Sequence, residues 1–465
     1  MKNILNMKKV SFLLLAISMT FVACEDFLDE SPPIGLTNDK LTDIPSMKAL
    51  VNGAYDKMRG FYAYQPMITS GFVRDYVVRT SANWAPYYKW TVSGVPQMFS
   101  GNSYNNGMRA LNAINTVLTA NVDAMYGTQA EKSKILGDAH FLRAAIYFQL
   151  NMYYTLPSSG NSIPLITTVL GTNDRVSVAT SAAIKAQVES DIEKAREYFK
   201  VANGVSTHTA ATAMAARIYF FHEKYNLAYD RANEAITSGS NTLEVNVADI
   251  YTKGSASTEA IYTIITNRTE NSFGPQSIGN TNFQADKDKG VASLNPNSLI
   301  AQLRNSDPND KRFKDLFTSK DGLVYIDKKY PSLDSDYIVL RLPEMYLTRA
   351  ESSIMVSGSV SAAAVSDVNM VRSRAGVTSI SGTPSTADML EMIYNERSKE
   401  LCFEYGDRFL NTRRLKKDIV AENGNGIIPH STYNELLVYP IPQSEVDIHN
   451  LKPVSYTHLT LPTKA

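Results

Sequence analysis

Residues 133–154 read SKILGDAHFLRAAIYFQLNMYY, a pattern that predicts a long, buried α-helix. One set of apolar residues recurs at helical spacing: Phe141, Ala145, Phe148 and Met152. A second set falls on another face: Leu142, Ile146 and Tyr153. Because residues three or four apart share one face of a helix, we expect this helix to be buried on two sides. Pro157 and the turn at residues 158–160 then end it.

Helical periodicity also dominates the chain on both sides of this segment. It predicts further helices at Ser46–Arg59, Tyr104–Leu118, Ser181–Phe199, Thr209–Lys224, Asn226–Ser238, Leu342–Val356, Ala362–Arg374 and Asp388–Tyr405. Alternation typical of strands is confined to short segments such as Ala260–Ile265, Gly322–Ile326 and Tyr337–Arg341. The pattern therefore indicates a mainly α fold with a few short strands.

Two of the predicted helix pairs resemble tetratricopeptide units. In the first, small and aromatic residues stand where a unit of roughly 34 residues needs them: Ala216, Tyr219, Tyr225, Ala228 and Ala235. In the second, Ala350 and Ala362 keep the same offset, but Ser353 stands at the aromatic position. Small residues let antiparallel helices approach closely, and such pairs stack on their neighbours as a scaffold. Two unrelated helix hairpins remain an alternative.

Residues 60–103 and 240–335 have a different texture. The first range places Pro and Gly between aromatic residues, and the second is rich in Asn, Gly, Ser and Asp. We therefore expect a tetratricopeptide-like helix-pair scaffold that carries two long irregular insertions. Loops on a rigid frame are common places for binding residues.

Composition excludes several classes of protein. Of 465 residues, 44% are hydrophobic and 20% are charged, which excludes wholesale disorder and coiled-coil proteins. Lys and Arg balance Asp and Glu at 46 each, so nothing favours nucleic acid as a partner. The chain has only two cysteines, Cys24 and Cys402, which excludes a disulfide framework.

The N-terminal segment has the pattern of an export signal. Lys2, Lys8 and Lys9 precede an apolar run, Val10–Ala23, that is shorter than the about 20 residues of a membrane-spanning helix. Cys24 follows directly, so the segment resembles a bacterial lipoprotein signal, in which residues 1–23 are removed and the cysteine is acylated. The alternative is an ordinary secretory peptide with an incidental cysteine.

Acidic residues follow this cysteine, at Glu25-Asp26 and Asp29-Glu30. Acids in this place resemble the surface-export signal of Bacteroidota-type lipoproteins. We therefore expect a protein that is lipid-anchored in the cell outer membrane and exposed at the surface. Several acyl chains on one cysteine would hold it stably.

Several motifs occur in a fixed order along the chain. They are Cys24-Glu25-Asp26-Phe27-Leu28-Asp29, Phe141-Leu142-Arg143-Ala144, Asp310-Lys311-Arg312-Phe313, residues 337–347 (YIVLRLPEMYL), residues 369–376 (NMVRSRAG), the charged segment Glu396–Arg408, and Tyr439-Pro440-Ile441-Pro442. Together they resemble the SusD/RagB family of outer-membrane nutrient-binding lipoproteins, over nearly all of residues 24–450. The resemblance implies a tetratricopeptide-like helical fold and a SusC-like TonB-dependent transporter as partner. It also implies an oligosaccharide ligand, or a peptide in some branches, and no catalysis.

The resemblance also suggests a domain layout. We expect one SusD-like domain at 24–450, with an N-terminal part at 24–240, the insertion at 240–335 and a C-terminal part at 336–450. The chain departs from the family at Asn411, where an Asp is usual, and at its end, which lacks the usual Asn-Pro-Gly-aromatic tail. Our hypothesis is that the atypical tail, 451–465, includes a dozen residues, 454–465, that are not native; intact-mass analysis of the natural protein tests it.

Candidate catalytic groups favour ion pairing over chemistry. Glu396, Glu400 and Glu404 lie four apart on one predicted helix face, among Arg and Lys residues. A glycosidase needs two carboxylates that flank the sugar from opposing sides, so we expect these acids to be structural. The alternative is a surface glycosidase that uses Glu400 or Glu404.

The sequence favours neither a metal site nor a cofactor. No His pair or His–Cys set has zinc spacing, and no nucleotide-binding loop or nucleophile elbow is present. We expect His140 and Cys402 to be core residues. The prediction is therefore a protein without catalytic residues, metal or cofactor.

The binding prediction rests on aromatic residues near position 85. Both tryptophans of the chain lie in this segment, and aromatic rings pack well on the C–H face of a sugar. The predicted ligand-binding residues are Trp84, Trp90, Tyr87 and Tyr88, with Asn83, Asp75 and Arg79 as hydrogen-bonding neighbours. Weaker candidates in the second insertion are Phe273, Asn282, Phe283 and Tyr330.

Two alternatives stay open at the sequence level. The rings near position 85 could instead pack the loop or face the transporter. The protein could also be a purely structural lid without ligand affinity.

Overall fold

The computed structural model describes residues 41–75, 85–92, 100–171, 173–202, 204–266, 298–305, 307–320, 323–332, 335–421, 426–433 and 435–451. Asp43–Ala465 form one compact unit, separate from Met1–Thr42. The unit is built around α6 (Gln129–Tyr154), which contains the predicted helix at residues 133–154. A capping box starts it: Thr128 Oγ1 accepts from the Glu131 amide (3.2 Å), and Glu131 Oε2 accepts from the Thr128 amide (2.9 Å).

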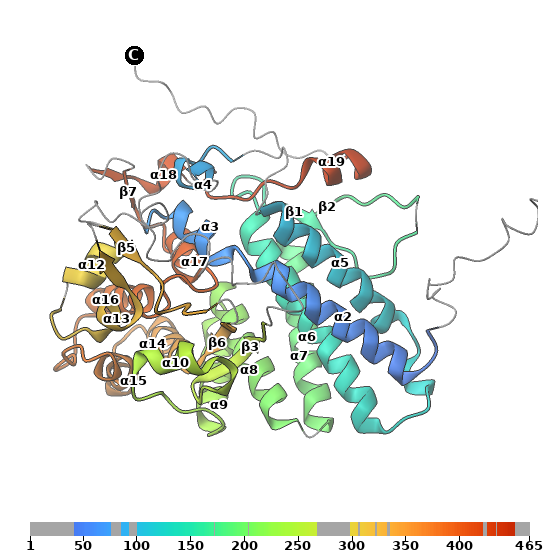
Figure 1. Cartoon of the computed structure of the whole chain (residues 1–465), viewed down its shortest axis with the longest axis horizontal. Coiled ribbons are helices and arrows are strands. Elements are labelled where there is room, and N and C mark those ends of the chain that lie inside the picture. The colour runs from blue at the N-terminus through green and yellow to red at the C-terminus, as the bar shows by residue number, and fades with distance from the viewer. Residues whose placement is uncertain are drawn as a thin grey trace, which may run out of the picture. The chain divides into compact units, whose positions relative to one another are not determined.

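α6 is buried on both of its apolar faces, as the two sets of apolar residues predict. α2 (Ile44–Tyr62) and α5 (Ser100–Thr119) pack against it from one side, and α7 (Ser181–Val201) packs along it from the other (Figure 1). Nearly every residue from Ile135 to Tyr154 is buried. α6 therefore joins the N-terminal helices to the rest of the scaffold.

The remaining helices follow in chain order. Before residue 240 they are α3 (Gln65–Phe72), α4 (Ala85–Lys89), η2 (Val122–Ala124), α8 (Val205–Phe221) and α9 (Tyr225–Thr237). After it they are α10 (Val247–Lys253), η3 (Gly254–Ala256), α12 (Leu299–Asn305), α13 (Lys311–Leu316), α14 (Leu342–Ser357), α15 (Ala362–Arg374), α16 (Thr386–Glu400), α17 (Asp407–Arg414), α18 (His430–Tyr433) and α19 (Gln443–His449). Within the described ranges, no helix combines the length and the apolar content that crossing a membrane requires.

The strands are short and pair two by two. In the described part of the chain the antiparallel pairs are β1 (Asn161–Pro164) with β2 (Val178–Thr180), β3 (Ala260–Ile264) with β6 (Tyr337–Arg341), β4 (Thr318–Lys320) with β5 (Leu323–Tyr325), and β7 (Ile419–Val420) with β8 (Ile427–Ile428). The β3–β6 pair joins segments that are far apart in the sequence. The mainly α prediction with a few short strands is confirmed.

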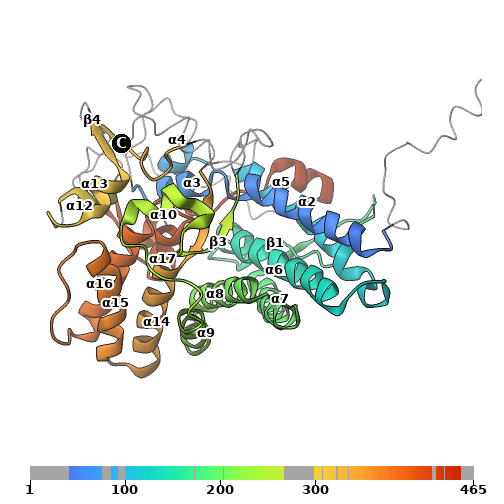
Figure 2. The same ribbon diagram turned by 60° about the horizontal axis from the view of Figure 1, so that its bottom comes forward.

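The helix pairs stack as a tetratricopeptide-like array. α6, α7, α8, α9 and α14 each pack on the next, and α14 also packs on α15 and α16 (Figure 2). Ala228 and Ala235 of α9 are buried, as the small positions of such a unit require. Both predicted pairs are therefore part of one stacked array.

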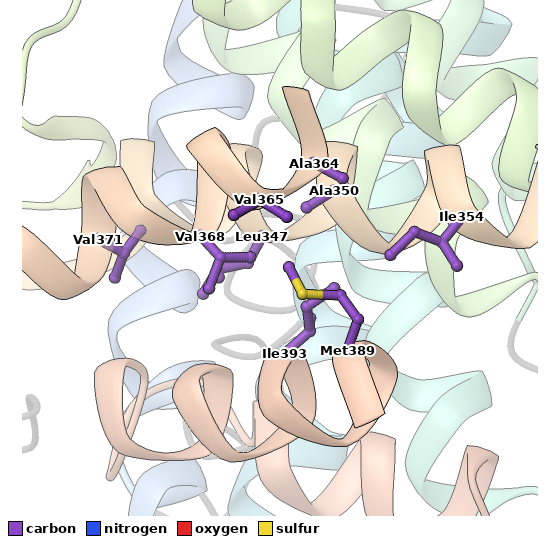
Figure 3. Packing of buried hydrophobic residues seen from close by; sticks show 9 residues of the cluster. All are labelled: Leu347, Ala350, Ile354, Ala364, Val365, Val368, Val371, Met389 and Ile393. Atoms are coloured by element: carbon purple, nitrogen blue, oxygen red, sulfur yellow. The ribbon is translucent and has the colours of Figure 1, made fainter. Parts of the chain in front are cut away.

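The second pair has an apolar core of its own. Leu347, Ala350 and Ile354 of α14 face four residues of α15, and Met389 and Ile393 of α16 close the cluster from below (Figure 3). The α15 residues are Ala364, Val365, Val368 and Val371. Ala350 is fully buried within this cluster.

α16 ends at Glu400, although its periodicity predicts a helix to Tyr405. Beyond Glu400 the backbone carbonyl groups are bound by buried side chains from another segment. Lys329 Nζ donates to the Cys402 carbonyl, and Tyr330 Oη donates to the Phe403 carbonyl (2.7 Å). Phe403 (φ +55°) and Gly406 (φ +101°) then adopt left-handed conformations that no helix contains.

The two predicted insertions contain more regular structure than their composition suggests. In 60–103, α3 is buried along its whole length and α4 follows it. In 240–335, α10, α12, α13 and the β4–β5 hairpin pack on the scaffold. Apolar residues such as Met67, Ile68 and Phe72 explain the difference, because they are part of the core.

Candidate ligand-binding region

Four of the seven predicted ligand-binding residues lie in the described part of the chain, on or beside α3 and α4. They are Asp75, Tyr87, Tyr88 and Trp90, and all four are buried. Arg79, Asn83 and Trp84 lie outside the described residues. Of the weaker candidates, Phe273, Asn282 and Phe283 also lie outside, and Tyr330 is buried.

The three described rings pack against protein. Tyr87 meets Phe72 edge-on at 5.6 Å between centroids. Trp90 donates from Nε1 to the Phe72 carbonyl (2.9 Å), and the Arg74 guanidinium carbon lies 3.9 Å from its ring centroid. Arg74 Nε also donates to the carbonyl of Tyr88 (3.2 Å). A ligand would reach these rings only after neighbouring side chains had moved.

Asp75 is paired with Arg408 in the same region. The two side chains approach to 2.6 Å between Oδ1 and Nη1. Burial raises the pKa of Asp75 to about 6, although the positive charge of Arg408 opposes this shift. Asp75 therefore carries a proton at mildly acid pH.

We expect the Asp75→Asn variant to lose part of the pH dependence of stability. Because the folded-state pKa of Asp75 is raised, its stabilising contribution is complete below about pH 4 and is lost as the pH rises through about 6. Urea unfolding from pH 4 to pH 7 should show the native free energy of unfolding falling relative to that of the variant, by about 2–3 kcal/mol.

A companion variant checks the cause of this shift. Arg408→Gln removes the opposing positive charge, so the pKa of Asp75 should rise further and the loss of stability should occur at higher pH. A constant difference in stability between the native chain and Asp75→Asn at every pH would contradict this assignment.

The three acids near the end of α16 are buried and ion-paired, as their spacing predicts. Arg312 Nη1 binds Glu396 (2.7 Å) and Glu400 (3.3 Å). Glu400 also binds Arg341 and Arg374.

Glu404 completes this network. It accepts from Lys329 Nζ (2.9 Å), from Arg341 Nε (3.0 Å) and from Tyr251 Oη (2.8 Å). Burial alone would raise the pKa of Glu400 and of Glu404, but the surrounding cations outweigh it and lower both. Both acids are therefore favoured in the ionised form, paired with cations in the interior.

A second buried network was not predicted from the sequence. Glu344 binds Arg217 and Arg397, and Arg397 also donates to Asp407 through Nε (2.9 Å). Asn411, where the family usually has Asp, donates from Nδ2 to Asp407 Oδ1 (2.9 Å). Asn411 therefore contributes a hydrogen-bond donor to this network.

The predicted core residues are confirmed. His140 is buried, and its Nδ1 lies 2.7 Å from Asp191 Oδ1. Cys402 is buried, and burial raises its pKa to about 11. Within the described ranges, no cluster of His, Cys, Asp and Glu side chains is arranged to hold a metal ion.

A cavity of about 480 Å³ opens where α6, α7, α8, α17 and α18 meet. This volume lies within the range of about 300–1,000 Å³ that is usual for small-molecule sites. Its charged lining residues are Lys185, Glu223, Arg413, Arg414 and Lys416, with His430 at α18. No sequence pattern pointed to it, because its walls come from segments far apart in the chain.

The cavity is connected to the predicted aromatic residues through α18. The His430 ring contacts Tyr433 at 5.3 Å between centroids, and Tyr433 contacts Trp90 at 5.7 Å. Trp90, which the sequence singles out, is thus two ring contacts away from the cavity lining. None of Glu396, Glu400 and Glu404 lines this cavity.

Several solved structures with similar folds are described as SusD proteins. A SusD superfamily protein from Bacteroides thetaiotaomicron matches with a TM-score of 0.74 at 20% identity, over 88% of this chain and 99% of that chain. A SusD-like carbohydrate-binding protein from Bacteroides vulgatus matches with a TM-score of 0.72 at 16% identity, over 88% and 97%. A SusD superfamily protein from Parabacteroides distasonis matches with a TM-score of 0.72 at 18% identity, over 90% and 99%.

Sequence comparison points the same way. Residues 325–450 match the model of the SusD family, and residues 26–220 match a family described as starch-binding and associating with the outer membrane. Among curated proteins, no sequence matches this chain. With these two matches, one in the N-terminal part of the chain and one in the C-terminal part, the chain belongs to the SusD/RagB family.

Proposed function

We propose that this protein captures oligosaccharides at the cell surface and delivers them to a SusC-like TonB-dependent transporter, without catalysis. The match of residues 26–220 to the family described as starch-binding and associating with the outer membrane carries this proposal. A carbohydrate-binding protein among the similar folds supports the same class of ligand.

Lipid anchoring is part of the proposal and rests on the N-terminal sequence. Cys24 follows a short apolar run, and acidic residues follow Cys24. Acylation there would hold the protein at the outer membrane, next to a transporter that takes up what it binds.

The paired acids support binding without chemistry. A glycosidase that used Glu400 or Glu404 would need one of them protonated and open to the sugar. Both are buried in ion pairs instead. If the purified protein nevertheless released reducing sugar, and Glu400→Gln or Glu404→Gln abolished the release, the proposal would be wrong.

Isothermal titration against soluble polysaccharides and peptides tests the ligand class. We expect a glycan to bind the full chain, purified in detergent from a Bacteroidota host, and the same host to yield the transporter as a co-purifying protein. Trp84→Ala should weaken glycan binding if the predicted aromatic residues form the site. Binding of peptides alone would place the protein in the peptide-binding branch, and no binding would favour a structural lid.

A further inference from the structure

The cavity between α6, α7, α8, α17 and α18 has an excess of positive charge. Lys185, Arg413, Arg414 and Lys416 line it, and Glu223 is its one acidic lining residue. We propose that this cavity binds a negatively charged group on a sugar, the carboxylate of a uronic acid or a sulfate ester. The inference rests on the proposed function and narrows it to acidic oligosaccharides.

Two of these cations already serve the fold. Arg413 donates to the carbonyl groups of Met152 and Thr155 (3.2 Å for the latter), which closes the C-terminal end of α6. Arg414 binds Glu351 (2.6 Å) and donates to Tyr225 Oη (3.0 Å). Their charge contributes to the cavity, but their side chains are held in place by protein partners.

The other two cations are uncompensated. Among the described residues, neither Lys185 nor Lys416 makes a salt bridge or a side-chain hydrogen bond. An ammonium group at the edge of a cavity can turn toward an anion at small cost, because it breaks no existing contact. An anion that enters here therefore gains two charge-assisted hydrogen bonds.

The walls of the cavity also include neutral residues. Asn151, Thr155 and Ser181 are polar and are hydrogen-bonded to one another, and Phe221 offers an apolar surface for the C–H groups of a sugar. Ser181 is the first residue of α7, so the positive end of this helix dipole adds to the field. Glu223 is exposed, and its carboxylate can accept a hydrogen bond from a sugar hydroxyl group.

The backbone holds two of the charged residues in an uncommon conformation. Glu223 (φ +61°) and Lys416 (φ +51°) are both left-handed, although neither is glycine. Each lies two residues beyond the last residue of a helix that lines the cavity. The α8 and α17 ends thus present their charged side chains at one place.

His430 adds a neutral polar group to the same wall. Burial lowers the pKa of His430 most, and the positive charges of Lys416 and Arg413 lower it further. The negative charge of Asp418 opposes this shift. The imidazole is therefore neutral at pH 7, and it can donate a hydrogen bond to a sugar hydroxyl group or accept one from it.

A pair of matched probes tests the charge requirement. Trigalacturonate carries three carboxylates, and its methyl ester has the same rings without charge. Titration calorimetry on the full chain in low-salt buffer should show the ester binding at least about tenfold more weakly. A sulfated galactose trisaccharide serves as the second anionic probe and separates a carboxylate ligand from a sulfate ligand.

Lysine variants test the location. Lys185→Gln and Lys416→Gln should each weaken binding of the preferred anionic probe about five- to tenfold. Lys194→Gln is the matched control, since Lys194 is exposed on the same helix as Lys185 and does not line the cavity. Unchanged thermal unfolding of all three variants would show that the fold is intact.

The outcomes separate this inference from the proposed function. Equal binding of the acid and its ester, failure of both anionic probes to bind, or unchanged affinity in the cavity variants overturns the acidic-sugar site. If neutral glycans then bind, the proposed function still stands. Binding of a peptide carboxylate with no glycan bound overturns both.

Discussion

Replacing Arg341 with methionine should lower the free energy of unfolding by about 3–5 kcal/mol. Arg341 ends β6 and is fully buried, and it donates to Glu259 (3.0 Å), Glu400 and Glu404. Methionine fills similar space but leaves these carboxylates with fewer cations in the interior. Such uncompensated buried charge costs far more than a lost surface pair.

The variant would be measured by urea unfolding, with Lys224→Met as control. The Lys224 ammonium is half-exposed and pairs with Glu189, so its loss should cost less than about 1 kcal/mol. If Arg341→Met fails to fold, Arg341→Lys is measured instead. This variant keeps the positive charge but lacks the planar guanidinium group, so its free energy of unfolding should fall by less. A change below 1 kcal/mol in Arg341→Met would refute the structural role of the network.

Replacing Cys24 with alanine should move the protein from the membrane fraction to the soluble fraction. On the proposed anchoring, the acylated cysteine holds the chain, and each buried methylene contributes about 0.8 kcal/mol. Without the thiol no acyl chain can be attached, so the loss of membrane binding should be nearly complete. Fractionation of cells followed by a carbonate wash measures it.

Cys402→Ala is the matched control, because Cys402 is the other cysteine of the chain and is buried. This variant should stay with the membrane. Protease treatment of intact cells would then show whether the anchored protein faces outward. Retention of Cys24→Ala in the washed membranes would contradict the lipoprotein assignment.

The motifs behind the family resemblance meet in one place in the fold. Arg312, Arg341 and Arg374 belong to three of these motifs, and all three bind Glu400 of a fourth. In this chain the motifs therefore supply a buried charge network that joins α13, β6, α15 and α16. Their ordered occurrence identifies the family because it specifies the fold rather than the ligand.

Local periodicity accounts for the accuracy of the helix prediction. α15 (Ala362–Arg374) and β6 (Tyr337–Arg341) have the predicted bounds, since apolar spacing and turn residues delimit them without help from distant segments. α16 is the exception. Past Glu400 the chain turns out of the helix through Phe403 and Gly406, and Lys329 and Tyr330 bind the carbonyl groups of this turn. No local pattern near residue 400 could reveal these distant partners.

The candidate site was the least predictable part. The sequence located both tryptophans in one segment, but it could not show that Trp90 is buried against Arg74 and Phe72. It gave no sign of the cavity, whose lining runs from Asn151 to His430. Lone Lys and Arg residues look like ordinary surface residues until their neighbours in space are known.

The sequence by itself determined the helix-pair scaffold, the family and the ion pairing of the α16 acids. Each of these depends on spacing within a segment or on the order of motifs, which a single chain records directly. Only the tertiary structure decided the partners of those acids, the burial of the aromatic residues near position 85 and the position of the charged cavity. These depend on which distant segments meet, and that is set by packing of the whole core.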